Sequence, residues 1–363
     1  MKSRAAVFTE PGQPLVIDEV EYGELAPGEV LVRNLYSGVC HSQLHQMYGP
    51  RAVPGPFLMG HESTSIVEAV GEGVTNVRAG DKAFVTWIPR DKRPGEGSPP
   101  PLKTPILWRG NNIGRGVYTW AEHTVARHEL VVKVPQDIPD DVTSIIGCAV
   151  MTGAGAAINT ADVQKGQSAA VFGVGGVGLS CIAGLHVREA DPIIAIDLDD
   201  EKLELARKFG ATITINAKQA NAIEEIIRIT GKGRLNPFGK PLSELDYAFD
   251  CIGKTVTIHQ ILEAVRAGDN SIDHGGKAIL VGVPDGEASI DALDLLRGEK
   301  TLTSSYGGSC RPDRDFPVFI RWFKEGLLDL NALVTERVSL DELNATCERL
   351  RHGDVLGRSV IRF

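Results

Sequence analysis

The sequence predicts an α/β protein in which a β-rich region is followed by a doubly wound, parallel six-stranded sheet. Residues 1 to about 150 contain short β patterns separated by glycine and proline turns. From Gly153 onward, apolar strands alternate with helical segments, and a glycine-rich turn joins the first of these strands to a helix. The length agrees with this division, because 363 residues exceed what one ordinary core holds.

The first region is typical of a rolled, mostly antiparallel domain. Its clearest strand patterns lie at residues 5–8, 29–33 and 65–70. After Tyr306 the pattern changes again, and we expect helices over 316–325 and 340–351 and a last strand over 358–363. This tail is expected to rejoin the first region. The predicted domains are therefore 1–152, 153–305 and 306–363.

Six strands are expected in the second region, which is the number in a complete dinucleotide-binding sheet. They lie near residues 168–172, 193–197, 212–215, 245–250, 277–283 and 301–304. Helical segments separate most of them, as parallel strands require.

The turn after the first of these strands is the most specific motif in the chain. It consists of Gly173, Val174, Gly175, Gly176, Val177 and Gly178. A buried strand, 168–172, precedes the turn, and a segment with helical apolar spacing, 179–190, follows it. The glycines therefore stand where a pyrophosphate meets a helix N-terminus, whose N–H groups and dipole favour an anion. The alternative is a strand–turn–helix connection with no ligand.

A carboxylate at the end of the next strand indicates which dinucleotide is bound. Asp197 follows the glycines by about twenty residues, the usual place for an acid that hydrogen-bonds the adenosine ribose. A phosphate on that ribose would face this charge. Asp199, Asp200 and Glu201 follow directly, with only Lys202 opposing them, so the sequence favours NAD over NADP.

The bulk composition excludes several classes of function. Hydrophobic content of 42% and charged content of 23% are those of a soluble globular protein, and the net charge of −9 argues against a nucleic-acid partner. No run approaches about 18 consecutive apolar residues, and no secretory signal is visible at the N-terminus, so no membrane association and a cytoplasmic location are expected. The six scattered cysteines fit reduced thiols better than a disulfide framework.

A second cluster of chemically active residues follows a strand of the first region. Residues 40–45, Cys-His-Ser-Gln-Leu-His, hold a thiol, two imidazoles and a hydroxyl. His61 and Cys148 follow at distances too wide for a local zinc signature. Two interpretations therefore stay open: that Cys40, His61 and Cys148 meet at a metal, or that they are a buried thiol, a turn histidine and a core cysteine.

The whole chain resembles the zinc-dependent alcohol dehydrogenases of the medium-chain dehydrogenase/reductase superfamily. The matching motifs are Cys-His-Ser followed by His45, Gly60-His61-Glu62, Gly147-Cys148 leading to Thr152, the glycine turn with Asp197 and Lys202, Val281-Gly282-Val283-Pro284, and Arg358. The resemblance implies a GroES-like catalytic domain into which a Rossmann domain is inserted.

The resemblance implies a catalytic zinc held by Cys40, His61 and Cys148, with a fourth position open for substrate or water. Two thiolates and a neutral imidazole suit tetrahedral zinc. Glu62 adjoins a ligand, but strand alternation is expected to point it away, so a role in tuning the metal is favoured over ligation. The alternative for Glu62 is a buried acid paired with a basic side chain.

The resemblance also implies roles in proton transfer and cofactor binding. Ser42 would take the hydroxyl proton of the substrate and pass it through the nicotinamide ribose to His45, which exchanges it with solvent. His41 and Arg358 would contact the pyrophosphate, although both could instead be ordinary surface residues. The nicotinamide would lie near the remaining matching positions, which are Thr152, Val281, Val283 and Tyr306.

The chain departs from many relatives in the lobe that follows residue 89. Those relatives carry four closely spaced cysteines that bind a structural zinc, and this chain has no cysteine between Cys40 and Cys148. One catalytic zinc and no structural zinc per subunit are therefore expected. Residues 90–115 instead contain six Lys or Arg against two acids. This segment is either a solvated face, an attraction site for an anionic substrate, or a subunit contact.

The substrate is expected to be a small-molecule primary or secondary alcohol, or the corresponding aldehyde. Trp87 and Trp120 align with positions that wall the substrate cleft of relatives, and packing inside the lobe is their alternative role. An alternative function is that of an S-(hydroxymethyl)thiol-type formaldehyde dehydrogenase. Arg51 weakens this alternative, because it lies about where the glutathione-dependent formaldehyde dehydrogenases of the superfamily place an acid. A zinc-free enoyl or quinone reductase and a non-catalytic NAD-binding protein stay open as competing functions. From its relatives, the protein is expected to form a homodimer or homotetramer.

Overall fold

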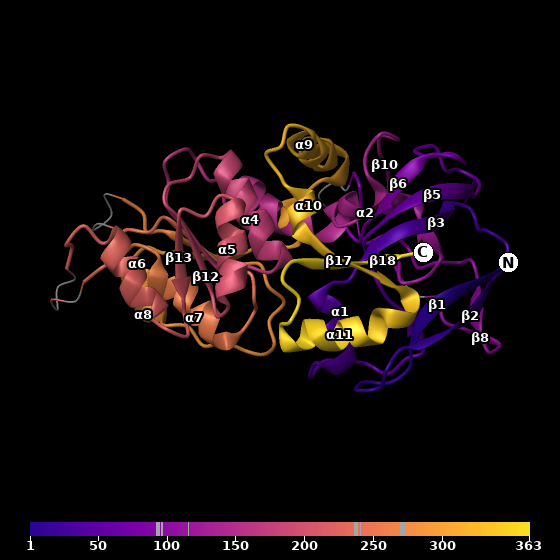
Figure 1. Ribbon diagram of the computed structural model, residues 1–363, viewed down its shortest axis with the longest axis horizontal. Helices are drawn as coiled ribbons and strands as arrows, with labels where there is room; N and C mark the ends of the chain where they lie inside the picture. The colour runs from indigo at the N-terminus through magenta and orange to yellow at the C-terminus, as the bar shows by residue number, and fades with distance from the viewer. Residues whose placement is uncertain (92–94, 96, 115, 236–238, 240, 269–272) are drawn as a thin grey trace. The chain divides into compact units, whose positions relative to one another are not determined.

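The computed structural model describes residues 1–91, 95, 97–114, 116–235, 239, 241–268 and 273–363. The chain forms two compact units, whose elements are labelled in Figure 1. Unit 1 comprises Met1–Ala149 and Cys310–Phe363, and unit 2 comprises Val150–Ser309. The sequence placed these boundaries after residues 152 and 305.

Unit 1 is built on two sheets. Its strands are β1 (Lys2–Phe8), β2 (Val16–Tyr22), β3 (Glu29–Gly38), β4 (Phe57–Leu58), β5 (Ser63–Val70), β6 (Lys82–Val85), β7 (Ile106–Trp108), β8 (Asn111–Asn112), β9 (His123–Arg127), β10 (Val131–Lys133), β17 (Val334–Ser339) and β18 (Arg358–Arg362). The strand orders are β4-β1-β2-β7-β8 and β10-β6-β5-β3-β18-β17, with β9 also pairing β3. Because β18 pairs antiparallel with β3, the C-terminal tail rejoins the first region as predicted.

The helices of unit 1 lie mostly in its C-terminal part. They are α1 (His41–Tyr48), η1 (His128–Leu130), α2 (Asp140–Thr143), α9 (Pro312–Lys324), α10 (Leu330–Leu333), η5 (Leu340–Glu342) and α11 (Leu343–His352). The helices predicted over 316–325 and 340–351 correspond to α9 and to η5 with α11. Helix α9 begins earlier than predicted, at Pro312, whose fixed φ suits the first helical turn.

Unit 2 contains one parallel sheet of six strands in the order β13-β12-β11-β14-β15-β16. Its strands are β11 (Ala169–Phe172), β12 (Ile193–Asp197), β13 (Ile213–Asn216), β14 (Tyr247–Asp250), β15 (Lys277–Leu280) and β16 (Thr301–Ser304). Its helical segments are α3 (Met151–Gly155), η3 (Ala156–Thr160), α4 (Gly176–Val187), α5 (Asp200–Lys208), α6 (Ala222–Thr230), α7 (Thr255–Ala264), α8 (Ala292–Arg297) and η4 (Gly307–Ser309). All six predicted strands are confirmed, and the order is that of a doubly wound dinucleotide-binding sheet.

One helical stretch, Asp140–Thr160, is long and apolar enough to cross a membrane by length and composition, although no such stretch was expected from the sequence. Its most apolar window is 89% buried inside the protein. This burial is what a core helix shows. The stretch includes α2, α3 and the π-helical segments η2 (Ile146–Val150) and η3.

Candidate metal centre

Cys40 and the residues that follow it are positioned by the end of β3. Val39 donates a backbone hydrogen bond to Ser359 of β18, and Cys40 then precedes the first residue of α1. Cys40 is 7% exposed. The strand therefore delivers the thiol into the interior of unit 1, and the helix presents the side chains that follow beside it.

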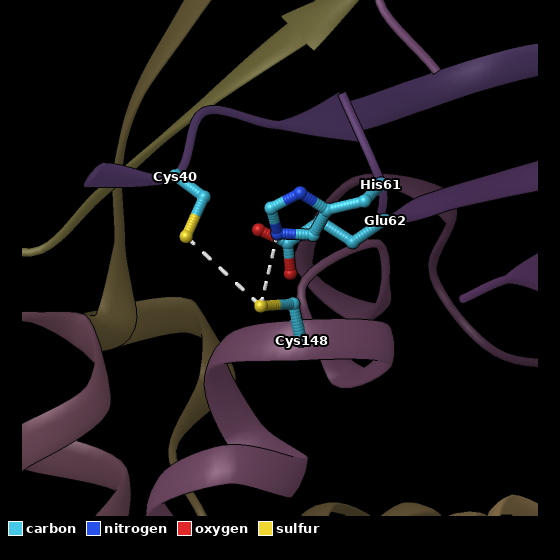
Figure 2. Close-up of side chains that lie close together, drawn as sticks. All are labelled: Cys40, His61, Glu62 and Cys148. Atoms are coloured by element: carbon cyan, nitrogen blue, oxygen red, sulfur yellow. Dashed lines mark hydrogen bonds between the residues drawn. The ribbon is translucent and has the colours of Figure 1, made fainter. Parts of the chain in front are cut away.

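His61 and Glu62 lie in the short link between β4 and β5 rather than in a strand. Gly60, just before them, has φ of +92°, a conformation that other residues rarely adopt. The chain therefore turns before His61, and the alternation of a strand does not govern the two side chains. Both point toward the same interior space as Cys40 (Figure 2).

Cys148 lies in η2, a π-helical turn, a widened turn that is frequent at functional sites. Two side chains of unit 1 hold this turn. The Thr86 hydroxyl donates to the carbonyl oxygen of Gly147 at 2.7 Å, and the backbone N–H of Ala149 donates to Glu62 Oε2 at 3.2 Å. The residues on both sides of Cys148 are therefore fixed by hydrogen bonds.

The structure brings together Cys40, His61, Glu62 and Cys148, with one ligand atom of each within 4.8 Å of the others. Cys148 Sγ lies 4.0 Å from Cys40 Sγ and 3.1 Å from His61 Nε2 (Figure 2). Tetrahedral zinc, with a Zn–S bond of about 2.3 Å and a Zn–N bond of about 2.0 Å, sets two sulfurs about 3.8 Å apart and sulfur and nitrogen about 3.5 Å apart. The two separations from Cys148 Sγ are therefore within about half an ångström of those that zinc requires, and the three donors predicted as metal ligands all lie within 4.8 Å of one another.

The two thiols differ in acidity because they share a hydrogen bond. The Cys148 thiol lowers the pKa of Cys40 well below its usual value, and the nearby Arg358 and His61 act in the same direction against burial. The same hydrogen bond, with burial, raises the pKa of Cys148. A thiolate therefore forms readily within this pair of sulfurs, where it can bind a cation.

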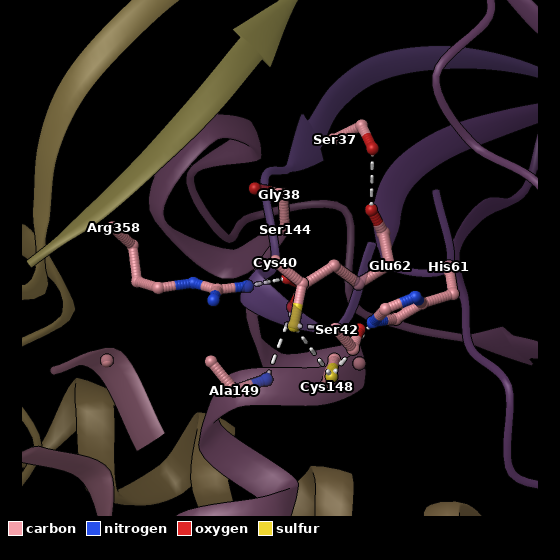
Figure 3. Close-up of polar contacts among 12 residues, drawn as sticks. Ser37, Gly38, Cys40, Ser42, His61, Glu62, Ser144, Cys148, Ala149 and Arg358 are labelled. Atoms are coloured by element: carbon pink, nitrogen blue, oxygen red, sulfur yellow. Dashed lines mark hydrogen bonds and ion pairs between the residues drawn. The ribbon is translucent and has the colours of Figure 1, made fainter. Parts of the chain in front are cut away.

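Glu62 and Arg358 form an ion pair inside unit 1, with the two residues 0% and 5% exposed. Burial raises the pKa of Glu62, and the Arg358 guanidinium opposes that rise. Figure 3 shows Ser37, Ala149 and Arg358 around Glu62. Gly38 makes room for the carboxylate, because an added Cβ there would overlap Glu62 Oε1.

These contacts correct two predictions. Glu62 does not point away from the ligands, since its carboxylate lies among them, and the alternative of a buried acid paired with a base is confirmed. Arg358 is not a surface residue. Its Nε is buried with no hydrogen-bond partner among the described residues, so one donor remains for an anion.

A buried polar layer supports the link that carries His61 and Glu62. Thr119 Oγ1 accepts from the backbone N–H of Glu62 at 3.2 Å and lies 2.8 Å from Ser37 Oγ. The Ser37 hydroxyl donates to the Glu62 carbonyl oxygen at 2.9 Å. These hydrogen bonds fix the backbone of the link that carries His61 and Glu62. The positions of the two side chains therefore do not depend on a bound metal alone.

Sequence reasoning missed Gln43. This side chain, in a residue 5% exposed, lies on the first turn of α1, and its Nε2 is 2.7 Å from His61 Nδ1. Histidines that bind metals almost always use the second ring nitrogen to hydrogen-bond a neighbouring group. A polar residue three positions after Cys40, beside an expected ligand set, was the signal that could have identified it.

The other predicted residues of α1 lie as follows. Ser42 is half-buried, and its hydroxyl is within hydrogen-bond distance of Cys40 Sγ, at 3.3 Å. His45 is half-buried one turn later, and its ring centroid lies 5.7 Å from that of the exposed His41. Ser42 and His45 are three positions apart and therefore share a helix face. Ser42 lies beside the donors and His45 lies one turn farther away, which is the order that the predicted proton path needs.

The residues predicted to line a substrate pocket separate into three cases. Trp87 lies beside the donors, its ring centroid 6.3 Å from that of His61. Trp120 does not wall a cleft: it is 0% exposed, and its indole N–H donates to Gly38 O at 3.0 Å, so packing inside the lobe is its role. Arg51 lies exposed in the turn after α1.

Two of the six basic side chains of segment 90–115, Arg90 and Arg109, make structural contacts. Arg90 pairs with Asp313, and Arg109 pairs with Asp18 and lies over the Trp108 ring. Lys92, Arg93 and Arg115 lie outside the described residues. Of the three alternatives, these contacts favour the solvated face with internal ion pairs.

Unit 2 carries the predicted nucleotide cradle. Buried β11 leads into Gly173, Val174 and Gly175, and Gly175 precedes the first residue of α4, which contains Gly176, Val177 and Gly178. A Cβ added at Gly175 would meet nothing within 4 Å. Open space therefore lies at the N-terminus of a twelve-residue helix, as a pyrophosphate site requires.

The acidic residues after β12 divide into different roles. Asp197 Oδ2 accepts from the backbone N–H of Val174 at 2.8 Å and Oδ1 from that of Leu198 at 2.7 Å, so this carboxylate lies against the glycine turn. Asp199 instead caps α5 by accepting from the backbone N–H groups of Glu201 and Lys202. Of these two carboxylates, Asp197 is thus the one placed for the ribose.

The remaining predicted cofactor residues of unit 2 present both buried and exposed surfaces. Thr152 is 9% exposed, and its Oγ1 is buried with no hydrogen-bond partner among the described residues. Val281 is half-buried, whereas Val283 and Tyr306 are 48% and 78% exposed. A bound nicotinamide would offer a hydrogen-bond partner to the Thr152 hydroxyl, and its ring would cover the exposed side chains of Val283 and Tyr306.

Comparisons with known proteins now identify the family. The model described as "Alcohol dehydrogenase GroES-like domain" matches residues 26–136, and "Zinc-binding dehydrogenase" matches residues 176–325. S-(hydroxymethyl)glutathione dehydrogenase of Paracoccus denitrificans is 32% identical over 389 residues, and alcohol dehydrogenase class-3 of Cereibacter sphaeroides is 33% identical over 395, each covering 100% of both chains. The chain belongs to the zinc-dependent alcohol dehydrogenase family of the medium-chain dehydrogenase/reductase superfamily.

The fold of this alcohol dehydrogenase agrees with solved structures. Benzyl alcohol dehydrogenase of Acinetobacter calcoaceticus matches 100% of this chain and 99% of its own, with a TM-score of 0.85 and 27% identity. The resemblance inferred from the motifs is confirmed, as are the GroES-like domain and the Rossmann-type parallel sheet. The enzyme is an oxidoreductase that acts on a small-molecule alcohol or aldehyde.

Proposed function

We propose that this enzyme transfers hydride between a primary or secondary alcohol and NAD, using one catalytic zinc per subunit and no structural zinc. The observation that carries the proposal is the convergence of Cys40, His61 and Cys148 in unit 1, three donors from distant parts of the chain. Among the described residues, this is the one group of three or more His, Cys, Asp or Glu side chains placed to hold a metal.

Zinc held by these three donors would polarise the substrate oxygen and lower the pKa of an alcohol there. Two thiolates would balance the charge of the ion. Glu62 and Arg358 balance one another, so the pair tunes the field around the donors without adding net charge. The role of the chain is to hold these groups in a buried, preorganised arrangement.

Ser42 and His45 are proposed to carry the proton. The Ser42 hydroxyl lies beside the ligand thiol of Cys40, where it would accept the proton from a substrate hydroxyl. His45 lies one turn farther along α1 and is only half-buried, so its imidazole would receive that proton through the cofactor ribose and exchange it with solvent.

NAD is proposed to be held by the glycine turn of unit 2, with Asp197 on the adenosine ribose. The buried, unsatisfied Thr152 Oγ1 and Arg358 Nε are the donors we assign to the nicotinamide region and the pyrophosphate. His41, exposed at the start of α1, would join Arg358 at the pyrophosphate, and Lys202 would lie near the adenosine. Hydride transfer itself is the chemistry of the nicotinamide.

Replacing Asp197 with asparagine is expected to reduce the preference for NAD over NADP by about tenfold or more, because one charge facing the 2′-phosphate is lost. Steady-state kcat/KM values for the two cofactors give the ratio. Asp200→Asn is the matched control, since Asp200 binds Asn216 and Gln219 instead. An unchanged ratio in Asp197→Asn would contradict the assignment.

The substrate is proposed to approach beside Trp87, the one predicted pocket residue that the structure places against a donor. A second candidate function, oxidation of an S-(hydroxymethyl)thiol adduct, is favoured by the name of the relative in Paracoccus, S-(hydroxymethyl)glutathione dehydrogenase. Against it stands Arg51, a cation where an acid would serve the ammonium group of the adduct.

An NADH-linked screen of short, branched, aromatic and carboxylated alcohols and aldehydes tests the proposal. S-(hydroxymethyl)glutathione is the competing substrate, and NADP is the cofactor control. Turnover of simple alcohols by protein that holds one zinc per subunit is the expected result. Exclusive turnover of the glutathione adduct would favour the second candidate, and absence of zinc from unchelated protein would refute the metal assignment.

The enzyme is proposed to act in the cytoplasm, since none of its six cysteines, all of them among the described residues, is in a disulfide. It is also proposed to assemble as a homodimer or homotetramer through unit 2. Strand β16 ends the parallel sheet, and an unpaired edge favours pairing with another chain. Leu293 and Leu296 of α8 are 52% and 74% exposed, as at a surface that another subunit would cover.

Leu296→Glu is expected to reduce the mass of the assembly measured by sedimentation velocity, because a charge would replace apolar surface at the contact. Leu327→Glu, at a leucine 43% exposed in unit 1, is the control and is expected to sediment as the unmodified enzyme does. An unchanged mass in Leu296→Glu, or a monomeric unmodified enzyme, would exclude this contact.

A further inference from the structure

Gln43 joins two residues that have different tasks in the candidate site. Its Nε2 lies 2.7 Å from Nδ1 of His61, a proposed metal ligand. Its Oε1 lies 3.4 Å from Oγ of Ser42, the proposed proton acceptor. The residue is 5% exposed, so water does not readily replace either partner. The amide is therefore part of a hydrogen-bonded chain that runs from His61 through Gln43 to Ser42.

The direction of the first hydrogen bond depends on which nitrogen of His61 carries the proton. His61 Nε2 faces Cys148 Sγ at 3.1 Å and is the nitrogen available to a metal. Binding a metal through Nε2 requires a lone pair there, so the proton must be on Nδ1. Nδ1–H then needs an acceptor, and Gln43 must present its oxygen. The 2.7 Å contact fixes the place of the amide, and the tautomer that binds a metal requires the amide oxygen rather than the amide nitrogen at Nδ1.

The hydrogen bond between Ser42 and Gln43 also depends on which end of the amide faces Ser42. The Ser42 hydroxyl has one proton, but both Cys40 Sγ and Gln43 Oε1 lie within reach as acceptors, at 3.3 and 3.4 Å. When the amide oxygen faces His61, the amide NH₂ faces Ser42 Oγ. The amide NH₂ then donates to Ser42 Oγ, and the hydroxyl proton is released from Gln43.

We propose that Gln43 is a positioning residue whose amide oxygen accepts from His61 Nδ1–H and whose amide NH₂ donates to Ser42, so that one side chain couples a metal ligand to the orientation of the proton acceptor. In this arrangement the Ser42 oxygen accepts one hydrogen bond from Gln43 and keeps one lone pair to accept from a substrate hydroxyl, while its own proton is free to be passed onward. The catalytic half of this inference rests on the proposed role of Ser42.

A carboxylate at position 43 would not perform both tasks. It would accept from His61 Nδ1–H, but it would also accept from Ser42 and would hold the hydroxyl proton. Only a group that is acceptor at one end and donor at the other fits His61 and Ser42 at the same time. The neutral amide also leaves the charge of two thiolates and a divalent ion balanced.

Two substitutions separate the two hydrogen bonds. Gln43→Met keeps the length of the side chain and removes both, so the zinc dissociation constant, measured by competition with a chromophoric chelator, is expected to rise about 10- to 100-fold. Gln43→Glu keeps the acceptor for His61, so zinc affinity is expected to stay within about threefold, while kcat of the zinc-loaded enzyme is expected to fall about tenfold or more. Gln46→Met, at an exposed position of α1, is the control and is expected to change neither quantity.

Unchanged zinc affinity in Gln43→Met would overturn the role at His61, and unchanged kcat in Gln43→Glu would overturn the coupling to Ser42. Ser42→Ala distinguishes failure of the proposed function. If Ser42→Ala turns over as the unmodified enzyme does, the proposed proton path is wrong, and the zinc affinity of Gln43→Met still decides whether the amide holds His61.

Discussion

Replacing Cys148 with alanine is expected to remove zinc from the enzyme and abolish turnover while leaving NAD binding intact. Cys148 Sγ is the atom toward which both Cys40 Sγ and His61 Nε2 point, so its loss leaves two of three protein donors. We expect zinc affinity to fall by at least about 100-fold, beyond the effect of losing a group that merely orients a ligand. Elemental analysis of desalted protein gives the zinc content, and titration calorimetry gives the NAD affinity.

Cys347→Ala is the matched control for this prediction. Cys347 is also a buried cysteine of unit 1, but it lies in the apolar core beside Leu343. Its truncation is expected to retain one zinc and normal turnover, with only a modest loss of stability. Full activity and one zinc in Cys148→Ala would refute the assigned ligand. Loss of NAD binding as well would show that the substitution disturbs more than the metal.

The cofactor cradle could be predicted from the sequence because its parts are local. Strand β11, the glycine turn, α4, β12 and Asp197 follow one another along the chain, and the hydrogen bonds that join them depend on this order. Burial of β11 was visible as an apolar run, and a helix was expected over 179–190, although α4 is buried nearly all round and not on one face only. Asp197 was assigned to the ribose from its place at the end of the strand, but the capping role of Asp199 was not predicted, because capping a helix and binding a ribose both favour an acid.

The metal centre was predictable only through resemblance. Cys40, His61 and Cys148 are brought together by pairing of β3 with β5 and by the folding of η2 against Thr86, contacts that no local spacing encodes. The prediction for Glu62 was wrong because it assumed a strand at a place where the chain turns at Gly60. The prediction that Trp120 lines the substrate cleft was wrong because tryptophan is common both in pockets and in cores.

Gln43 and Arg358 show what a single sequence conceals. A glutamine on the first turn of a short helix looks like a surface residue, and only its 2.7 Å contact with His61 gives it a role. Arg358 begins the last strand of the chain, and its partner precedes it by 296 residues. Such a pairing depends on the parallel and antiparallel contacts of β18, which are known only from the folded chain.

Replacing Arg358 with methionine is expected to lower the free energy of unfolding of unit 1 by about 3–5 kcal/mol, because it leaves the Glu62 carboxylate buried without its partner. Glu62→Gln is also expected to be destabilising, because it leaves the Arg358 guanidinium buried without its partner. The double substitution removes both charges and is expected to be at least about 2 kcal/mol more stable than the sum of the two effects. All four tryptophans, Trp87, Trp108, Trp120 and Trp322, belong to unit 1, so tryptophan fluorescence in urea follows this unit alone.

Arg337→Met supplies the control for this ion pair. Arg337 lies on β17, the strand parallel to β18, and pairs with Asp141 where the two side chains are 44% and 25% exposed. Because solvent screens this pair, its loss is expected to cost less than about 1 kcal/mol. If Arg358→Met unfolds as Arg337→Met does, or if the double variant shows no recovery, the ion pair does not stabilise unit 1. A large recovery would show that the two charges are retained for the chemistry of the donors beside them, since an uncharged pair would then serve the fold as well.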